Sequence, residues 1–189
     1  MKKVIFTLSI ASFSFANAQV IIGDAVGTAA NKTSVLLEFA ANQNKGIIVP
    51  YVRTLPTGNA LVGGSIILDA TTATAARMKY YNETVWVDLS GQNANVTTAL
   101  ANQPTGITEA AEARAIIGTV PDPIPGTFPE GALVLNSTTK AMVLPTVADV
   151  QDILSPSPGM MVYVAGVSPT FYKRLAVFNG SKWSFWKPE

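Results

Sequence analysis

The chain reads Asn44-Lys45-Gly46-Ile47-Ile48-Val49-Pro50, and 95 residues later it reads Thr139-Lys140-Ala141-Met142-Val143-Leu144-Pro145. Each stretch is an aliphatic run that ends at a proline, which lacks the N–H that a central strand needs. Each run also follows another apolar segment, Leu37-Glu38-Phe39 in the first case and Leu133-Val134-Leu135 in the second. This similarity predicts an internal repeat built from short β-strands.

Two further blocks recur downstream in the same order. One pair is Gly64-Ser65-Ile66-Ile67-Leu68 and Gly159-Met160-Met161-Val162-Tyr163, again 95 residues apart. The other is Tyr80-Tyr81-Asn82-Glu83-Thr84-Val85-Trp86 and Val177-Phe178-Asn179-Gly180-Ser181-Lys182-Trp183, now 97 residues apart, as if a hairpin had gained two residues. Ordered blocks at nearly constant spacing favour a repeat. The alternative is that apolar strands bounded by Pro, Gly and Trp resemble one another in any β protein.

The punctuation between the apolar runs predicts a mainly β fold. It consists of two related small β-modules of short antiparallel strands and hairpins, with one or two short helices and a Pro-rich linker. We place an N-terminal strand and tail at residues 19–33, module 1 at 34–90, a polar and Pro-rich linker with a short helix at 91–131, and module 2 at 132–189. Asn179-Gly180 predicts a type I′ hairpin turn in module 2.

Helix is expected only locally. Thr146-Val147-Ala148-Asp149 has the spacing of a capping box, which predicts a short helix over 147–154. The Ala- and Glu-rich stretch 109–117, which follows Thr108, predicts a second, and 96–101 is compatible with one helical turn. Four prolines within 119–131 predict a stiff, extended linker.

Composition excludes several kinds of chemistry. The 189 residues include no Cys and no His, with 13 Lys and Arg against 12 Asp and Glu. Disulfides, Cys or His catalysis and the usual zinc sites are therefore excluded, and we expect no catalytic, cofactor-binding or metal-binding residues. The formal charge of +1 is not the electrostatic footprint of a nucleic-acid-binding protein.

The first eighteen residues have the pattern of a signal peptide. Lys2 and Lys3 precede an apolar run, and Ala16-Asn17-Ala18 offers the small residues of a cleavage site. We expect the mature chain to begin at Gln19, with no transmembrane segment after cleavage and a location outside the cell or on its outer surface. The alternative, an uncleaved anchor helix, needs about 20 apolar residues, and serines interrupt a shorter run here.

The acidic residues could in principle supply the carboxylate pair of a hydrolase. Glu38, Asp69, Glu83 and Asp88 are carboxylates of the kind that glycosidases use in pairs. No spacing places any two of them in one cleft, so we expect solvated charges at turns and strand edges. We therefore predict that the protein is not an enzyme.

Two aromatic residues are candidates for ligand or subunit contact, namely Trp186 and Tyr172. Trp186 lies three residues after Trp183 and hence on the opposite face of a strand. If Trp183 packs in the core, Trp186 is free to stack on a sugar or on another subunit.

The segment Gln19-Val20-Ile21-Ile22-Gly23 is a candidate self-assembly strand. An apolar terminal strand can complete the sheet of a neighbouring subunit by β-augmentation. It can equally pair within its own chain, and the sequence leaves both alternatives open.

The residues also resemble a known module. The order Lys-Gly-apolar-Pro, Gly-apolar-Tyr and Phe/Tyr-Asn-Gly-x-x-Trp is similar to a short module of exported and cell-surface proteins of Bacteroidota. That module often lies ahead of tail-fibre-like regions. Residues 145–183 match it best, through Pro145, the stretch Gly159 to Tyr163, and Phe178-Asn179-Gly180 followed by Trp183. The resemblance implies an exported β-rich surface protein without an assigned reaction.

These observations lead to one functional expectation and one alternative. We expect a secreted or cell-surface structural or adhesive protein that self-assembles through sheet-edge pairing, as a filament or fibre subunit. Its partner would be itself, with surface glycans or other envelope proteins as further candidates and no nucleic acid. The alternative is a glycan-binding surface module.

Overall fold

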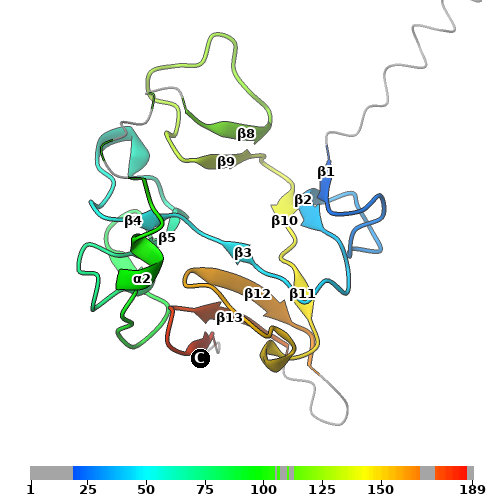
Figure 1. Ribbon diagram of the computed structural model, residues 1–189. Helices are drawn as coiled ribbons and strands as arrows, with labels where there is room; N and C mark the ends of the chain where they lie inside the picture. The colour runs from blue at the N-terminus through cyan, green and yellow to red at the C-terminus, as the bar shows by residue number, and fades with distance from the viewer. Residues whose placement is uncertain (1–18, 105, 107–109, 111–112, 167–172, 187–189) are drawn as a thin grey trace, which may run out of the picture.

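The structure, a computed structural model, describes residues 19–104, 106, 110, 113–166 and 173–186. The fold is mainly β, with several small sheets in a solenoid-like arrangement (Figure 1). This confirms the predicted fold class. Among the described residues helix is limited to single turns, and none of these is long and apolar enough to cross a membrane. The predicted signal peptide lies outside the described residues.

Residues 19–104 contain seven strands and two helical turns. They are β1 (Val20–Ile22), β2 (Val35–Phe39), β3 (Ile47–Ile48), β4 (Tyr51–Val52), the 3-10 turn η2 (Gly58–Ala60), β5 (Ile66–Asp69), β6 (Arg77–Tyr81), β7 (Trp86–Asp88) and α2 (Thr97–Leu100). The helical turn expected over 96–101 is thus present as α2.

The described residues of 113–166 and 173–186 contain seven more strands and one 3-10 turn. They are β8 (Ala115–Gly118), β9 (Leu133–Asn136), β10 (Ala141–Met142), β11 (Thr146–Val147), η3 (Val150–Asp152), β12 (Met160–Val164), β13 (Arg174–Phe178) and β14 (Trp183–Phe185).

The second half repeats the first strand by strand. The order β4-β5-β6-β7 in one sheet matches β11-β12-β13-β14 in another. In each, the first pair of strands is parallel and the next two pairs are antiparallel. The registers also correspond, because Tyr81 pairs with Trp86 and Phe178 pairs with Trp183. Residues 20–88 and 115–185 are hereafter called repeat 1 and repeat 2.

Local contacts recur with the registers. The Gly64 N–H donates to the Tyr81 carbonyl at 2.8 Å, and the Gly159 N–H donates to the Phe178 carbonyl at the same distance. The rings of Tyr81 and Trp86 lie 5.3 Å apart between centroids, as do those of Phe178 and Trp183. The internal repeat read from the sequence is therefore present in the fold.

The repeat extends further towards the N-terminus than the sequence analysis placed it. β1 pairs with β2 in parallel, and β8 pairs with β9 in parallel. The segments Val20-Ile21-Ile22-Gly23 and Ala115-Ile116-Ile117-Gly118 are thus equivalent, and each ends at a glycine with positive φ, +107° and +114°. The prediction of a helix over 109–117 is wrong at its end, because Ala115–Gly118 is a strand. The β-branched pair Ile116 and Ile117 gains more from pairing with β9 than the local helix propensity supplies.

The Pro-rich stretch is a crossover loop and not an extended linker. It connects β8 to β9, which lie side by side, so the chain must reverse within residues 119–132. A turn helps it to do so, since the Phe128 N–H donates to the Pro125 carbonyl at 2.9 Å. The Asn59 side chain donates to the Gly126 carbonyl and fastens the loop to repeat 1.

The predicted helix over 147–154 is also wrong. Thr146–Val147 pairs with β12 as β11, and only η3 is helical. A capping box exists one turn later than expected, where Asp149 accepts from the Gln151 N–H at 3.0 Å and Asp152 accepts from the Asp149 N–H at 3.2 Å. The strand forms because a parallel partner satisfies the backbone groups that a helix would otherwise have paired.

The predicted hairpin between β13 and β14 is present, but its turn is not type I′. Four residues separate the last paired positions, Phe178 and Trp183, and only Gly180 has positive φ, +107°. The Asn179 side chain instead accepts from the N–H groups of Ser181 and Lys182, both at 3.0 Å. The loop is therefore stabilised by hydrogen bonds to the Asn179 side chain and not by positive φ at both central residues, as the sequence predicted.

The two repeats exchange strands. β10 of repeat 2 pairs with β2 of repeat 1, and β3 of repeat 1 pairs with β12 of repeat 2. Figure 1 shows β3 (cyan) beside β12 (orange), and β10 beside β2. The division into modules at 34–90 and 132–189 stays a prediction, but strands of the two segments share sheets.

The core follows from this exchange. β12 alternates its side chains between two clusters of buried apolar residues, as a strand covered on both faces must. Met161 packs with Leu68, Met78 and Val96 of the first half, whereas Val162 packs with Val147 in repeat 2. β12 is therefore the element that joins the two cores.

A substitution at Gly180 tests the geometry of the hairpin turn. We expect Gly180→Ala to lower the free energy of unfolding by about 1–3 kcal/mol, because L-residues are strained at positive φ. The added Cβ would also lie 3.0 Å from Pro158 Cγ and from Val96 Cγ1. Urea unfolding followed by tryptophan fluorescence measures the change, with Ser181→Ala in the same loop as control. Equal stability of the two variants would contradict the observed turn.

Candidate assembly interface

The contact between the repeats begins at β3. Ile47 pairs with Met161 and Ile48 with Met160, and the Val49 N–H donates to the Gly159 carbonyl at 3.0 Å. Two strands that are short by themselves thus extend one another's hydrogen bonding.

Tyr51 extends this contact to Pro158 and Gly159, which precede β12. Its hydroxyl donates to the Pro158 carbonyl at 2.7 Å, and its ring lies against Gly159. Burial raises the pKa of the Tyr51 hydroxyl, because loss of water disfavours the phenolate. The neutral hydroxyl is the form that donates this hydrogen bond.

Gly46 allows the closest approach in the contact. A Cβ at this position would lie 2.4 Å from Met160 Cγ and 2.7 Å from the Met161 carbonyl oxygen. Only a residue without a side chain fits, so the Lys-Gly step of the repeat has a packing reason. The equivalent residue of repeat 2 is Ala141, and its environment differs accordingly.

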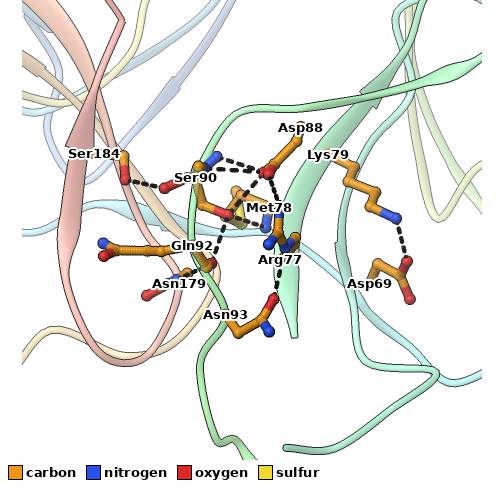
Figure 2. A network of polar contacts seen from close by, with 11 residues as sticks. Asp69, Arg77, Met78, Lys79, Asp88, Ser90, Gln92, Asn93, Asn179 and Ser184 are labelled. Carbon is orange, nitrogen blue, oxygen red and sulfur yellow. Dashed lines mark hydrogen bonds and ion pairs between the residues drawn. The ribbon is translucent and has the colours of Figure 1, made fainter. Parts of the chain in front are cut away.

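A polar network joins the repeats on another side (Figure 2). Asn179 is fully buried, and its side-chain amide donates to the Gln92 carbonyl at 2.8 Å. The Ser184 hydroxyl donates to the Ser90 carbonyl at 2.5 Å. The hairpin of repeat 2 is thereby fixed to the segment that follows β7.

Two carboxylates of repeat 1, Asp69 and Asp88, are held by basic partners. Asp69 and Lys79 form an ion pair at 2.7 Å, and Asp88 and Arg77 form one at 2.5 Å. Figure 2 shows the two pairs pointing away from each other. Burial by itself would raise the pKa of Asp88, but hydrogen bonds from Ser90 and Arg77 outweigh it and lower the pKa. Among the described residues, no group of three or more acidic side chains forms a metal site.

Glu38 departs most from the sequence expectation. It is fully buried rather than solvated and forms an ion pair with Lys32 at 2.5 Å. The N–H groups of Thr28 and Ala29 donate to its second oxygen, each at 2.9 Å, and the Gln19 side chain donates to the first. A charged residue inside the apolar run of β2 was the available signal.

The pKa of Glu38 follows from these contacts. Burial raises it, but the hydrogen bond from Lys32 and those from the two backbone N–H groups lower it by more. The ionised carboxylate therefore holds residues 19–32 against β2. The equivalent residue of repeat 2 is Val134, so this arrangement occurs only in repeat 1.

The candidate self-assembly strand lies within this arrangement. Val20–Ile22 forms β1, which pairs with β2 of its own chain and is the edge strand of the sheet β1-β2-β10. The role of Gln19 to Gly23 in assembly stays a prediction. In-chain pairing leaves the outer edge of β1 available for a strand of another copy.

Of the two candidate aromatic contacts, the structure describes only Trp186. Trp186 is 56% exposed, and its neighbour Phe185 is also exposed with the Arg174 guanidinium 4.1 Å from its ring centroid. Tyr172 lies outside the described residues. Trp183 packs against the core of repeat 2, as its repeat position indicated.

The two repeats differ most at one surface. Leu37 on β2 is fully buried between β1 and β10, whereas its equivalent Leu133 on β9 is 47% exposed. A groove of about 310 Å³ lies where β10, β11 and β12 meet, and it is lined by Met142, Val143, Leu144, Thr146 and Tyr163. At the equivalent place in repeat 1, Val49, Tyr51 and Leu68 pack against Met161 of repeat 2.

Asn179 tests the polar network. We expect Asn179→Ala to lower the free energy of unfolding by about 1–3 kcal/mol more than Asn82→Ala, because it leaves a buried carbonyl without its donor. Asn82 is the matched control, since it accepts the same two loop hydrogen bonds at an exposed site of repeat 1. Chemical denaturation measures both. Equal losses would mean that the contact with Gln92 adds nothing.

Glu38 tests the buried ion pair. A carboxyl whose pKa is lowered by folding stabilises the protein above its unfolded pKa, here 4.5, and this contribution is lost as the pH falls through the lower, folded pKa. We expect Glu38→Gln to lose about 2 kcal/mol at pH 7 and to show a smaller loss on acidification than the wild type. Thermal unfolding from pH 7 to pH 3 measures this, with the exposed Glu130→Gln as control. An unchanged pH slope would refute the assignment.

One comparison with known proteins gives a match. Residues 117–188 match the family described as the phage tail like trimerisation region, which covers less than half of the chain. No curated protein and no solved structure matches. The matched residues contain most of repeat 2, including β9, the groove and β12. Repeat 2 is therefore similar to a trimerisation region, which fits a structural, fibre-like protein that associates with copies of itself.

Proposed function

We propose that the protein is an exported structural subunit that assembles as a trimer into a fibre-like or adhesive structure on the cell surface. The observation that carries this proposal is the match of residues 117–188 to a trimerisation region. The exposed Leu133 on β9 and the groove lined by residues 142–146 and Tyr163 supply surfaces on which association can occur.

The mechanism is association without turnover. Backbone groups at a sheet edge are satisfied by a second copy, and apolar side chains such as Leu133 lose their water in the same step. Of the carboxylates first weighed for hydrolysis, Glu38, Asp69 and Asp88 are held in ion pairs. This use of the acidic residues supports a structural role over an enzymatic one.

Export and surface location rest on the sequence. Residues 1–18 have the pattern of a signal peptide, and the resemblance to a Bacteroidota surface module agrees with it. Adhesion would place glycans or other envelope proteins among the partners. Glycan binding is supported separately by the exposed ring of Trp186.

The proposal is tested by the mass of residues 19–189 in solution. We expect light scattering across a concentration series to give three times the monomer mass, because the matched region is one of trimerisation. Deleting residues 19–23 removes an edge strand, and we expect weaker self-association.

A monomer at every concentration would contradict the trimer. In that case the glycan-binding alternative becomes the better hypothesis. A glycan array with the wild type and Trp186→Ala then measures it directly, and binding that survives the substitution would exclude this tryptophan as the sugar platform.

A further inference from the structure

We propose that copies of the chain associate head to tail, and that the contact between copies reproduces the contact between the two repeats. This inference rests on the proposed self-association and names its surfaces. The trailing surface is residues 133–135, 141–146 and Tyr163 of repeat 2. The leading surface is residues 46–48 and 63–67 of repeat 1 in another copy.

The first argument is that β3 and β10 are equivalent strands that use opposite edges. β10 donates from Ala141 to the Ser34 carbonyl and from Val143 to the Leu37 carbonyl, each at 2.8 Å. Its equivalent β3 instead pairs with β12, and Val49 continues that contact. Alternate residues of a strand direct their hydrogen bonds to opposite sides. Each strand thus leaves available the edge that the other one uses.

The second argument is the pattern of satisfied groups. The Val49 N–H donates to the Gly159 carbonyl, but its equivalent, the Leu144 N–H, has no partner within the described part of the chain. Residue 64 of another copy is the equivalent of Gly159. A hydrogen bond from Leu144 to the partner's Gly64 would therefore satisfy the group as Val49 is satisfied.

The third argument is burial. The trailing surface exposes apolar residues. Their equivalents in repeat 1 are buried, because repeat 2 lies against them. Leu133 is 47% exposed and Tyr163 is 36% exposed, whereas Leu37 and Leu68 are both fully buried. On the leading surface, Ile48 is 50% exposed. Apolar area of this kind at an unpaired edge favours a protein contact.

The fourth argument is the fit of side chains at the closest point. In the chain, Gly46 is small and faces the long Met160. At the proposed contact the equivalent residues are Ala141 and the partner's Ser65, so a larger residue meets a smaller one. Ala141 thus fills part of the space that the partner's shorter Ser65 leaves, as close packing favours. The groove beside Leu144 would receive the partner's Ile66, the equivalent of Met161.

The contact is heterologous, since a trailing surface binds a leading surface. Each chain has one of each, so the assembly closes into a ring or continues as a filament. Closure at three copies agrees with the matched trimerisation region. Every copy in such a ring buries both of its surfaces.

The test uses two variants that each block one surface. Leu133→Lys places a charge on the trailing surface, and Ile48→Lys places one on the leading surface. Each alone is expected to weaken association roughly tenfold or more, which light scattering detects as monomer at concentrations where the wild type is a trimer. Leu154→Lys is the matched control, because Leu154 is 95% exposed and belongs to neither surface. It is expected to remain a trimer.

Mixing the two blocked variants gives the sharpest outcome. The intact leading surface of Leu133→Lys can bind the intact trailing surface of Ile48→Lys, and the complex then has no functional surface left. We expect a one-to-one dimer from two monomeric proteins. An isologous contact, in which both copies use the same surface, would give no rescue by mixing.

A crosslink covers the case in which either lysine variant fails to fold. The chain has no cysteine, so Ile47→Cys with Leu133→Cys adds a single pair. Their equivalents, Met142 and Leu37, are paired in register within the chain. Oxidation is expected to give a covalent trimer on a denaturing gel.

The outcomes separate the two proposals. A wild-type monomer overturns the proposed function itself. A wild-type trimer that is unaffected by both lysine substitutions, or that forms no covalent trimer on oxidation, overturns only the head-to-tail contact.

Discussion

Edge pairing by the short strand β3 and its equivalent β10 is the interaction on which the rest of the structure depends. Two residues of strand cannot hold a sheet together, yet β3 joins repeat 1 to β12 and β10 joins repeat 2 to β2. Because backbone groups at an edge need a partner, each repeat supplies hydrogen bonds to an edge of the other. Among the described residues, the outer edge of β9, which pairs only with β8, has no such partner. An assembly of copies would begin at this edge.

The repeats diverge at the positions where their surroundings differ. Asp69 and Lys79 form an ion pair in repeat 1, whereas their equivalents in repeat 2 are the buried apolar residues Val164 and Ala176. A second apolar layer covers that face in repeat 2, and water reaches it in repeat 1. Val134 stands at the position of Glu38, which in repeat 1 accepts hydrogen bonds from the Thr28 and Ala29 N–H groups in the crossover between β1 and β2. The sequence differences between the repeats thus follow from the residues that surround each position.

Polar residues in this fold act as fasteners. Asn179, Ser90 and Glu38 are buried, and each is bonded to backbone of a segment distant in sequence. Such groups are costly to bury alone and specific once paired, so they define which loop lies against which strand. A protein without cysteine uses these contacts where a small exported domain often uses disulfides. These contacts agree with a structural role. The carboxylates of Glu38, Asp69 and Asp88 are occupied by ion pairs.

Sequence alone determined the β class, the repeat and its 95- to 97-residue spacing, and the hairpin at Asn179, because alternation, prolines and glycines act locally. It failed at 115–117 and at Val147, where Ala-Glu composition and a Thr-x-x-Asp spacing indicated helix. Partners distant in sequence, β9 and β12, pair with these residues as strands instead. Only the tertiary structure decided that Glu38 is buried, that the repeats exchange strands, and that Leu133 is exposed while Leu37 is not. Those outcomes depend on which segments meet, and a local pattern carries no information about its partner.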